Sequence, residues 1–252
     1  NMDKTNDSSL DSSPTVVDEN QNNFFSEVEE NREKSLFKNS YKVLARKYRP
    51  QNFEDLMGQE IMVQTLKNAF KTNRIAHAYI LTGVRGIGKT TTARLLARSL
   101  NYETETVNEP NIDMPEIGKH CQEIMESRHI DVIEMDAASR TGIADIREII
   151  DSVNYSPSSA RYKIYIIDEV HMLSKAAFNG LLKTLEEPPP HVKFIFATTE
   201  VQKIPLTILS RCQRFDLKRF DHDMIKLLIN NVCEKEMISI EDPIIDLIAK
   251  AS

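Results

Sequence analysis

The sequence has few cysteines and no long apolar run, and both shortages narrow the class of protein. Only three of its 252 residues are cysteines. Cys121, Cys212 and Cys233 are odd in number and widely spaced, which argues against a disulfide framework and favours a reducing compartment such as the cytoplasm. No stretch is apolar for long enough to span a bilayer, and no apolar signal segment follows the N-terminus, so we expect no membrane association.

The net charge of −6 is unevenly distributed along the chain. Residues 1–40 carry nine acidic and four basic side chains, and so account for five of the six net negative charges. The remaining residues are nearly balanced, and a balanced domain can still present one basic face. The overall charge therefore does not exclude a nucleic-acid partner.

Composition divides the chain into three parts. Residues 1–40 are rich in Asp, Asn, Ser and Glu and have few large apolar side chains, so we expect a disordered acidic extension. Its few apolar residues leave open a short docking helix. Residues 41–219 have a globular composition and predict one domain, and residues 220–252 predict the truncated start of a second, helical domain.

Strand and helix patterns alternate through the globular part. Apolar runs predict five strands, at 77–82, 130–135, 163–168, 193–198 and 213–217. Helical spacing and capping residues predict seven helices, at 59–72, 88–100, 142–154, 174–186, 205–210, 221–236 and from 242 onward. Such alternation predicts an α/β fold with a parallel five-stranded sheet, helices on both faces, and ligand sites at the carboxyl ends of the strands.

One segment matches the phosphate-binding loop pattern G-x-x-x-x-G-K-[ST] at every fixed position. It consists of Gly83, Val84, Arg85, Gly86, Ile87, Gly88, Lys89 and Thr90. Glycines let backbone N–H groups turn toward phosphate oxygens, and the following helix directs its positive end at them. Lys89 adds a positive charge, and Thr90 offers a hydroxyl to Mg²⁺. The segment, with the adjoining Thr91, predicts a site for ATP and Mg²⁺.

A second motif follows further along the chain. The run Lys163-Ile164-Tyr165-Ile166-Ile167-Asp168-Glu169 is an apolar strand that ends in two carboxylates, which is typical of nucleotide hydrolysis sites. Each motif has a plainer alternative, since an ordinary glycine turn and a solvated acidic strand end are both common. The occurrence of the two motifs in this order favours a nucleotide-hydrolysing domain over these alternatives.

Further motifs resemble those of AAA+ clamp-loader ATPases. They are Lys47-Tyr48-Arg49-Pro50, Phe53, Gly58-Gln59, Asp136-Ala137-Ala138-Ser139-Arg140, Asp168-Glu169-Val170-His171-Met172-Leu173, Leu182-Lys183-Thr184-Leu185-Glu186-Glu187-Pro188-Pro189, Ala197-Thr198-Thr199 and Ser210-Arg211-Cys212. Together they resemble the gamma/tau family of bacterial DNA polymerase III subunits over residues 41–252. The resemblance implies a P-loop AAA+ core and a helical lid. It also implies a motor that opens a sliding clamp and loads it onto primer-template DNA within a hetero-oligomeric ring of clamp-loader subunits.

The resemblance implies roles for four residues of the two nucleotide motifs. Lys89 would hold the β- and γ-phosphates of ATP. Thr90 and Asp168 would hold Mg²⁺, and Glu169 would polarise the attacking water. No carboxylate pair beyond Asp168 and Glu169 stands in a nucleotidyl-transfer setting, so we expect no polymerase active site.

Two more roles follow from the resemblance alone. Thr199, with Thr198 as the alternative, would be the sensor that hydrogen-bonds the γ-phosphate or the attacking water. Arg211 would reach the γ-phosphate bound by a neighbouring subunit, a task that suits a planar and permanently charged side chain.

The same resemblance implies DNA contacts for Arg140, Arg147 and Lys183, which would touch phosphates in a central chamber. A solvated basic face is the plainer interpretation of these three side chains. Because no aromatic residues are interleaved with them, any contact should be independent of base sequence.

The chain departs from the family pattern in one place. The family inserts a four-cysteine zinc module after the first nucleotide helix, but here Tyr102, Pro115 and Gly118 stand where ligands would be, and only Cys121 remains. One thiolate and the neighbouring histidine do not make a closed four-ligand site. We therefore expect no zinc, and an irregular surface insertion over residues 101–122.

Two alternatives stay open. Another AAA+ machine, such as a branch-migration helicase or a helicase loader, would share the ATPase motifs, although the Ser-Arg-Cys run and the Glu-Glu-Pro-Pro turn favour a clamp loader. A non-catalytic scaffold subunit is the other alternative, and the intact loop lysine and acidic pair argue against it.

Overall fold

The computed structural model describes residues 44–139 and 143–251, so the prediction of a disordered extension at residues 1–40 lies outside the described residues. The chain divides into two units, with the boundary between Tyr48 and Arg49. In the described part of the first unit, α2 covers Leu44–Lys47. The phosphate-binding loop and the acidic pair lie in the second unit.

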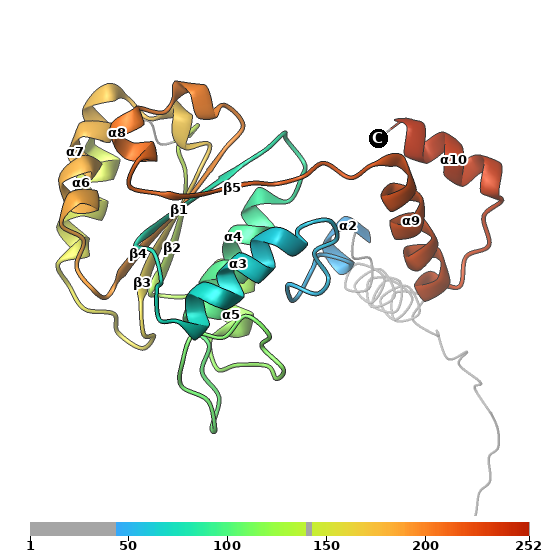
Figure 1. The fold of residues 1–252 in the computed structure, drawn as a ribbon, viewed down its shortest axis with the longest axis horizontal. Helices are drawn as coiled ribbons and strands as arrows, with labels where there is room; N and C mark the ends of the chain where they lie inside the picture. The colour runs from blue at the N-terminus through green and yellow to red at the C-terminus, as the bar shows by residue number, and fades with distance from the viewer. Residues whose placement is uncertain (1–43, 140–142, 252) are drawn as a thin grey trace, which may run out of the picture. The chain divides into compact units, whose positions relative to one another are not determined.

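The second unit alternates helices and strands as the sequence predicts (Figure 1). Its strands are β1 (Ala78–Thr82), β2 (Val132–Asp136), β3 (Lys163–Asp168), β4 (Val192–Thr198) and β5 (Gln213–Asp216). Its helices are α3 (Glu60–Lys71), α4 (Lys89–Leu100), α5 (Cys121–Met125), α6 (Ile143–Val153), α7 (Lys175–Glu186), α8 (Leu206–Leu209), α9 (His222–Glu236) and α10 (Asp242–Ala251), with short 3-10 helices η1 (Val170–Met172) and η2 (Val201–Lys203). Among the described residues of this unit, the short helix α5 and the two 3-10 turns are additions to the predicted elements, and α2 in the first unit was not predicted either.

The five strands form one parallel sheet in the order β2-β3-β4-β1-β5. Thr82 at the end of β1 is level with Thr198 on β4, and Asp136 at the end of β2 is level with Asp168 on β3. The carboxyl ends of the strands therefore meet at one edge of the sheet, with β4 between the two strands that carry the nucleotide motifs. The predicted fold class is confirmed.

Helices cover both faces of the sheet, and the central strands β1 and β4 are therefore buried along their whole length (Figure 1). Side chains alternate along β1: Tyr79 and Leu81 join a core with α3, α4 and α5. Ala78 and Ile80 join a second core with α6, α7 and α8. A parallel sheet inside two helical layers requires such uninterrupted apolar strands.

Two helices follow the sheet. Asp221 caps α9 by accepting a hydrogen bond from the N–H of Met224 at 2.8 Å, as an N-cap aspartate does. α9 has no buried residue, whereas α10 buries Ile245 and Ala249. Among the described residues, no helix combines the length and apolarity needed to cross a membrane.

Candidate nucleotide-binding and hydrolysis site

The phosphate-binding loop joins β1 to α4 and depends on backbone angles that favour glycine. Gly86 and Gly88 have φ of 83° and 92°, in the left-handed region that L side chains rarely adopt. A Cβ at either position would meet no atom within 4 Å, so backbone conformation and not space requires glycine there. Open space beside a glycine backbone is what close approach of a phosphate needs.

Lys89 begins α4 and folds back over the loop. Its side chain is buried, and Nζ donates hydrogen bonds to the carbonyl oxygens of Gly83 and Val84, both at 3.0 Å. The ammonium group of Lys89 thus lies against the loop, where the sequence predicts that phosphate binds.

Thr90 connects the loop helix to the acidic strand end. Its hydroxyl donates a hydrogen bond to Oδ2 of Asp168 at the end of β3, and the other oxygen, Oδ1, accepts the N–H of Glu169 at 2.9 Å. A hydroxyl beside a carboxylate is the kind of oxygen donor set that Mg²⁺ takes in phosphate sites. The donors and the open glycine backbone fit ATP with Mg²⁺.

Glu169 has a backbone conformation that is unusual for its type. Its φ and ψ are 46° and 43°, which is left-handed and costs a non-glycine residue about 1–2 kcal/mol. Its Oε2 accepts a hydrogen bond from the Thr199 hydroxyl at 3.1 Å and lies 3.4 Å from Nδ1 of His171. Both contacts involve Oε2, so these two partners, Thr199 and His171, do not take up Oε1.

The two threonines after β4 have different surroundings. Thr198 is fully buried, and its hydroxyl contacts His171 Nδ1 at 2.9 Å and accepts the N–H of Glu200 at 3.0 Å. Thr199 instead faces Glu169 directly. Its assignment as the sensor stays a prediction, but of the two threonines it is the one brought into contact with the acidic pair.

His171 is a member of this cluster that the sequence analysis does not single out. The 3-10 turn after Glu169 brings its imidazole back to the strand ends, where the side chain is only 6% exposed. The available signal was its position two residues after Glu169, in the run that follows the acidic strand end.

Arg211 lies away from this chain's own loop. Gln213 at the start of β5 pairs with Tyr79 near the amino end of β1, whereas the loop follows the carboxyl end of that strand. Arg211 precedes β5 and forms an ion pair with Glu186 at 2.8 Å and a hydrogen bond to the Thr207 carbonyl at 2.6 Å. The predicted role on a neighbouring subunit stays a prediction.

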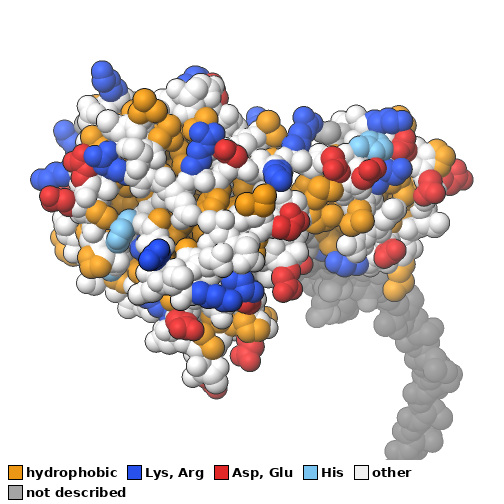
Figure 2. Space-filling model, viewed as in Figure 1, with side chains coloured by type: hydrophobic (Ala, Val, Ile, Leu, Met, Phe, Trp, Pro, Cys, Tyr) orange, Lys and Arg blue, Asp and Glu red, His pale blue; other side chains and the backbone are white. Residues whose placement is uncertain are grey.

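The residues expected at DNA are only partly described. Arg140 lies outside the described residues. Arg147 on α6 and Lys183 on α7 are both exposed, and their helices pack closely where Gly180 faces Ile150. Figure 2 shows Lys and Arg side chains scattered among acidic and apolar ones on the viewed face, without one continuous basic patch. The DNA contacts stay predictions.

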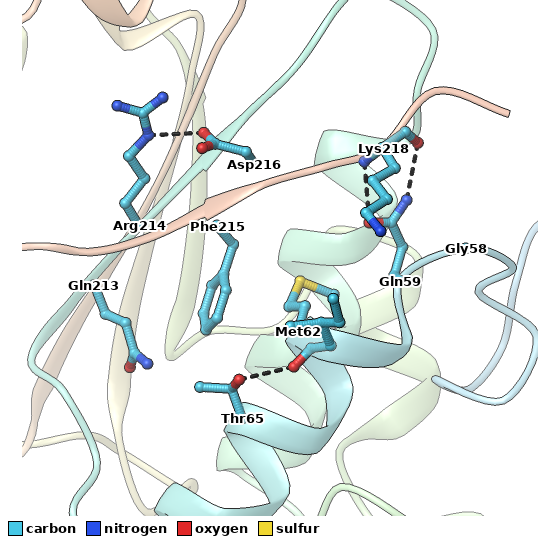
Figure 3. Close-up of a pocket in the computed structure, with 10 residues that line it drawn as sticks. Gly58, Gln59, Met62, Thr65, Gln213, Arg214, Phe215, Asp216 and Lys218 are labelled. Carbon is cyan, nitrogen blue, oxygen red and sulfur yellow. Dashed lines mark hydrogen bonds and ion pairs between the residues drawn. The ribbon is translucent and has the colours of Figure 1, made fainter.

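A pocket of about 380 Å³ lies beside the edge strand β5 and helix α3 (Figure 3). Its lining includes Gly58, Gln59, Met62, Phe215, Asp216 and Lys218. The Gln59 side chain closes one end by bonding the backbone N–H and carbonyl of Lys218, at 3.2 and 3.0 Å. None of the loop or acidic-pair residues lines it, so this pocket is distinct from the site that the motifs define.

Asp216 links that edge strand to the start of the loop. It accepts hydrogen bonds from the Thr82 hydroxyl and, at 2.7 Å, from Nε of Arg214. Burial opposes ionisation of Asp216, but the Arg214 and Thr82 hydrogen bonds outweigh it and lower the pKa of this carboxyl. An ionised Asp216 thus fixes β5 beside the residue that precedes the loop.

In the insertion, Gly118 and Cys121, two of the residues at the expected zinc-ligand positions, contact one another directly. Cys121 Sγ accepts hydrogen bonds from Arg98 Nε at 2.7 Å and from the Gly118 N–H at 3.2 Å. A Cβ on Gly118 would lie 2.9 Å from the Glu103 carbonyl oxygen and 3.1 Å from the Tyr102 ring, so only glycine fits. Within the described ranges, no group of three or more His, Cys, Asp or Glu side chains could hold a metal ion.

The fold and the site define a class of protein. A parallel five-stranded sheet with a phosphate-binding loop after β1 and an acidic pair after β3 is the P-loop AAA+ ATPase fold. The chain superimposes on the RuvB Holliday junction branch migration motor of Thermotoga maritima with a TM-score of 0.56 and 21% identity, over 81% of this chain and 59% of that one. This likeness concerns the fold alone.

Sequence comparison identifies the family. The model of the family described as DNA polymerase III, delta subunit, matches residues 58–221, and the chain belongs to that family. It is 50% identical over 213 residues to the DNA polymerase III subunit tau of Escherichia coli (strain K12), covering 84% of this chain and 32% of that protein. The predicted resemblance is confirmed.

Two further relatives are also DNA polymerase III subunits. The Bacillus subtilis (strain 168) DNA polymerase III subunit tau is 49% identical over 84% of this chain and 37% of its own length. The DNA polymerase III subunit gamma of Buchnera aphidicola subsp. Acyrthosiphon pisum is 49% identical over 81% of this chain and 55% of its own length. The chain thus spans about a third of the tau subunits and about half of the gamma subunit.

Proposed function

We propose that this chain binds and hydrolyses ATP as the motor domain of a clamp-loader subunit of DNA polymerase III. The observation that carries the proposal is the link between the two nucleotide motifs, in which the Thr90 hydroxyl bonds Asp168. Membership of the DNA polymerase III subunit family supports it. The chain would act in the cytoplasm, with other clamp-loader subunits, a sliding clamp and primer-template DNA as partners.

The chemistry follows from the side chains. Lys89 would exchange its loop carbonyls for the β- and γ-phosphate oxygens. Thr90 and Asp168 would hold Mg²⁺, which when bound neutralises phosphate charge. Glu169 would orient and polarise the attacking water, and Thr199 would keep Glu169 in place from the adjacent strand end.

A branch-migration motor is the alternative with a matching fold, but its similarity to this chain is 21% identity, against 50% for a DNA polymerase III subunit. We therefore favour clamp loading over branch migration.

The test is ATP binding and hydrolysis by the full-length protein assembled with its partner subunits. We expect Lys89→Ala to abolish ATP binding, and Glu169→Gln to bind ATP but hydrolyse it on the order of 100-fold or more slowly. Lys67→Ala is the matched control, because it removes the same charge from an exposed ion pair with Asp113. Equal ATP affinity in the wild type and Lys89→Ala would contradict the proposal.

A further inference from the structure

Glu169, the residue proposed to polarise water, is not held by the threonine sensor alone. The His171 side chain lies between two carboxylates, with Nδ1 at 3.4 Å from Glu169 Oε2 and Nε2 at 3.4 Å from Glu200 Oε1. Its Nδ1 also hydrogen-bonds the hydroxyl of the buried Thr198 at 2.9 Å. One imidazole therefore contacts residues from the end of β4 and from both turns that follow β3 and β4.

The carboxylate on the far side is anchored independently. Glu200 accepts a hydrogen bond from Lys203 at 2.9 Å, and this hydrogen bond outweighs the opposing effect of desolvation and lowers the pKa of Glu200. Its N–H is held by the Thr198 hydroxyl. The buried Thr198 therefore restricts the position of the His171 ring on its Nδ1 side, and the anchored Glu200 carboxylate faces the ring on its Nε2 side.

We propose that His171 is a positioning residue for Glu169 in ATP hydrolysis. With a proton on Nδ1, the imidazole directs it at Thr198 Oγ1 and Glu169 Oε2. Together with the Thr199 hydroxyl it fixes Oε2, and Oε1 is left as the oxygen that orients the attacking water. The left-handed backbone of Glu169 needs such support, because that conformation persists only where its surroundings hold it.

This inference rests on the ATPase function proposed above, and a matched pair of variants tests it. In His171→Asn the amide nitrogen can take the place of Nδ1, whereas in His171→Gln it can take the place of Nε2 only. We expect His171→Gln to slow single-turnover ATP hydrolysis by the assembled full-length protein on the order of 10- to 100-fold, with unchanged ATP affinity. We expect His171→Asn to restore most of the rate.

A second readout does not depend on turnover. The imidazole signals of His171, assigned by their loss in His171→Asn, should shift in NMR spectra when Glu169→Gln removes the neighbouring charge. If the His171 variants do not fold, Thr198→Val and Thr198→Ser test the same contact, since serine keeps the hydroxyl and valine does not. Hydrolysis should then be slower in the valine variant than in the serine variant.

The outcomes separate this inference from the proposed function. Wild-type rates in both His171 variants, equal losses in both, or reduced ATP affinity in His171→Gln would each overturn the positioning role while ATP hydrolysis stands. An unshifted His171 signal in Glu169→Gln would overturn it as well. An assembled wild-type protein that does not hydrolyse ATP would overturn the proposed function, and the inference with it.

Discussion

Nε2 of His129 lies 2.9 Å from Nδ1 of His120, and these two buried imidazoles form the middle of a series of hydrogen bonds that joins the insertion to the segment before β2. His129 Nδ1 accepts the backbone N–H of Asp131 at 3.0 Å, so the ring proton of neutral His129 lies on Nε2 and points at His120. His120 directs its own Nε2 at Glu103 Oε2, 3.3 Å away. With both rings neutral, each of the four ring nitrogens has a hydrogen-bond partner.

Stability should therefore fall in mild acid. Burial, with a smaller contribution from the neighbouring His120, lowers the pKa of His129 below its usual value of about 6.5. The unfolded chain takes up a proton on His129 as pH falls below that value, while the folded chain resists it. The stabilisation is complete above about pH 6.5 and is lost as the pH falls toward the lowered pKa.

The measurement is the free energy of unfolding by urea between neutral and mildly acidic pH. His129→Gln keeps a donor toward His120 but does not titrate, so its stability should depend less on pH than that of the wild type. Parallel pH profiles for the two proteins would contradict this prediction.

The insertion should contain no zinc. Arg98 and Gly118 already donate hydrogen bonds to Cys121 Sγ, and packing around Gly118 leaves no room for a side chain. Elemental analysis of the purified protein should find far less than one zinc per chain, and Cys121→Ser should not change that content. Stoichiometric zinc that survives dialysis and is lost in Cys121→Ser would show that His120 and nearby carboxylates complete a site.

Arg211 should act on a neighbouring subunit. In the assembled full-length protein, Arg211→Ala should keep ATP binding but lose DNA-stimulated hydrolysis, by on the order of 10³-fold or more if it acts like the arginine fingers of related enzymes. Glu186→Gln breaks the ion pair of Arg211 but leaves its charge, and serves as the matched control.

Mixing two inactive subunits decides between action within one chain and between chains. An Arg211→Ala subunit has an intact loop, and a Lys89→Ala subunit has an intact arginine. Activity should return at interfaces where the first supplies the loop and the second the arginine. If mixed rings form and stay inactive, Arg211 acts within its own chain or only stabilises the fold.

The backbone of Glu169 should limit stability. Glu169→Gly and Glu169→Ala both remove the carboxylate and its bond to Thr199, and they differ chiefly in the tolerance of a left-handed backbone, which outweighs the larger backbone entropy that glycine loses on folding. We expect the glycine variant to be more stable than the alanine variant by about 1 kcal/mol in chemical unfolding, and both to be inactive. Equal stabilities would mean that the backbone relaxes at this position.

Local patterns were sufficient to predict much of the fold. Apolar runs predicted the strands, and helical spacing predicted the long helices. The loop and the acidic pair predicted Lys89, Thr90 and Asp168 as members of one candidate site. The strand order could not be predicted from the chain pattern, because the insertion of β1 between β4 and β5 depends on contacts between distant segments. α5 was missed because five residues are too few to establish a period.

The side-chain network around Glu169 shows a second limit. Motif spacing predicts which residue types follow a strand, but not which of them turn back toward it. His171 returns through a 3-10 turn that begins at a left-handed residue, and no residue-type preference predicts glutamate in that conformation. Its partners Thr198 and Glu200 lie about 30 residues away, at the end of another strand.

The contacts of Lys89 have a consequence for nucleotide affinity. The ammonium group is already bonded to two backbone carbonyls of its own loop, so phosphate binding is an exchange of acceptors and not a gain of new ones. The measured affinity reports the difference between two sets of charge-assisted hydrogen bonds. Because the lysine is already ordered against the loop, little of its side-chain entropy remains to be lost when phosphate arrives.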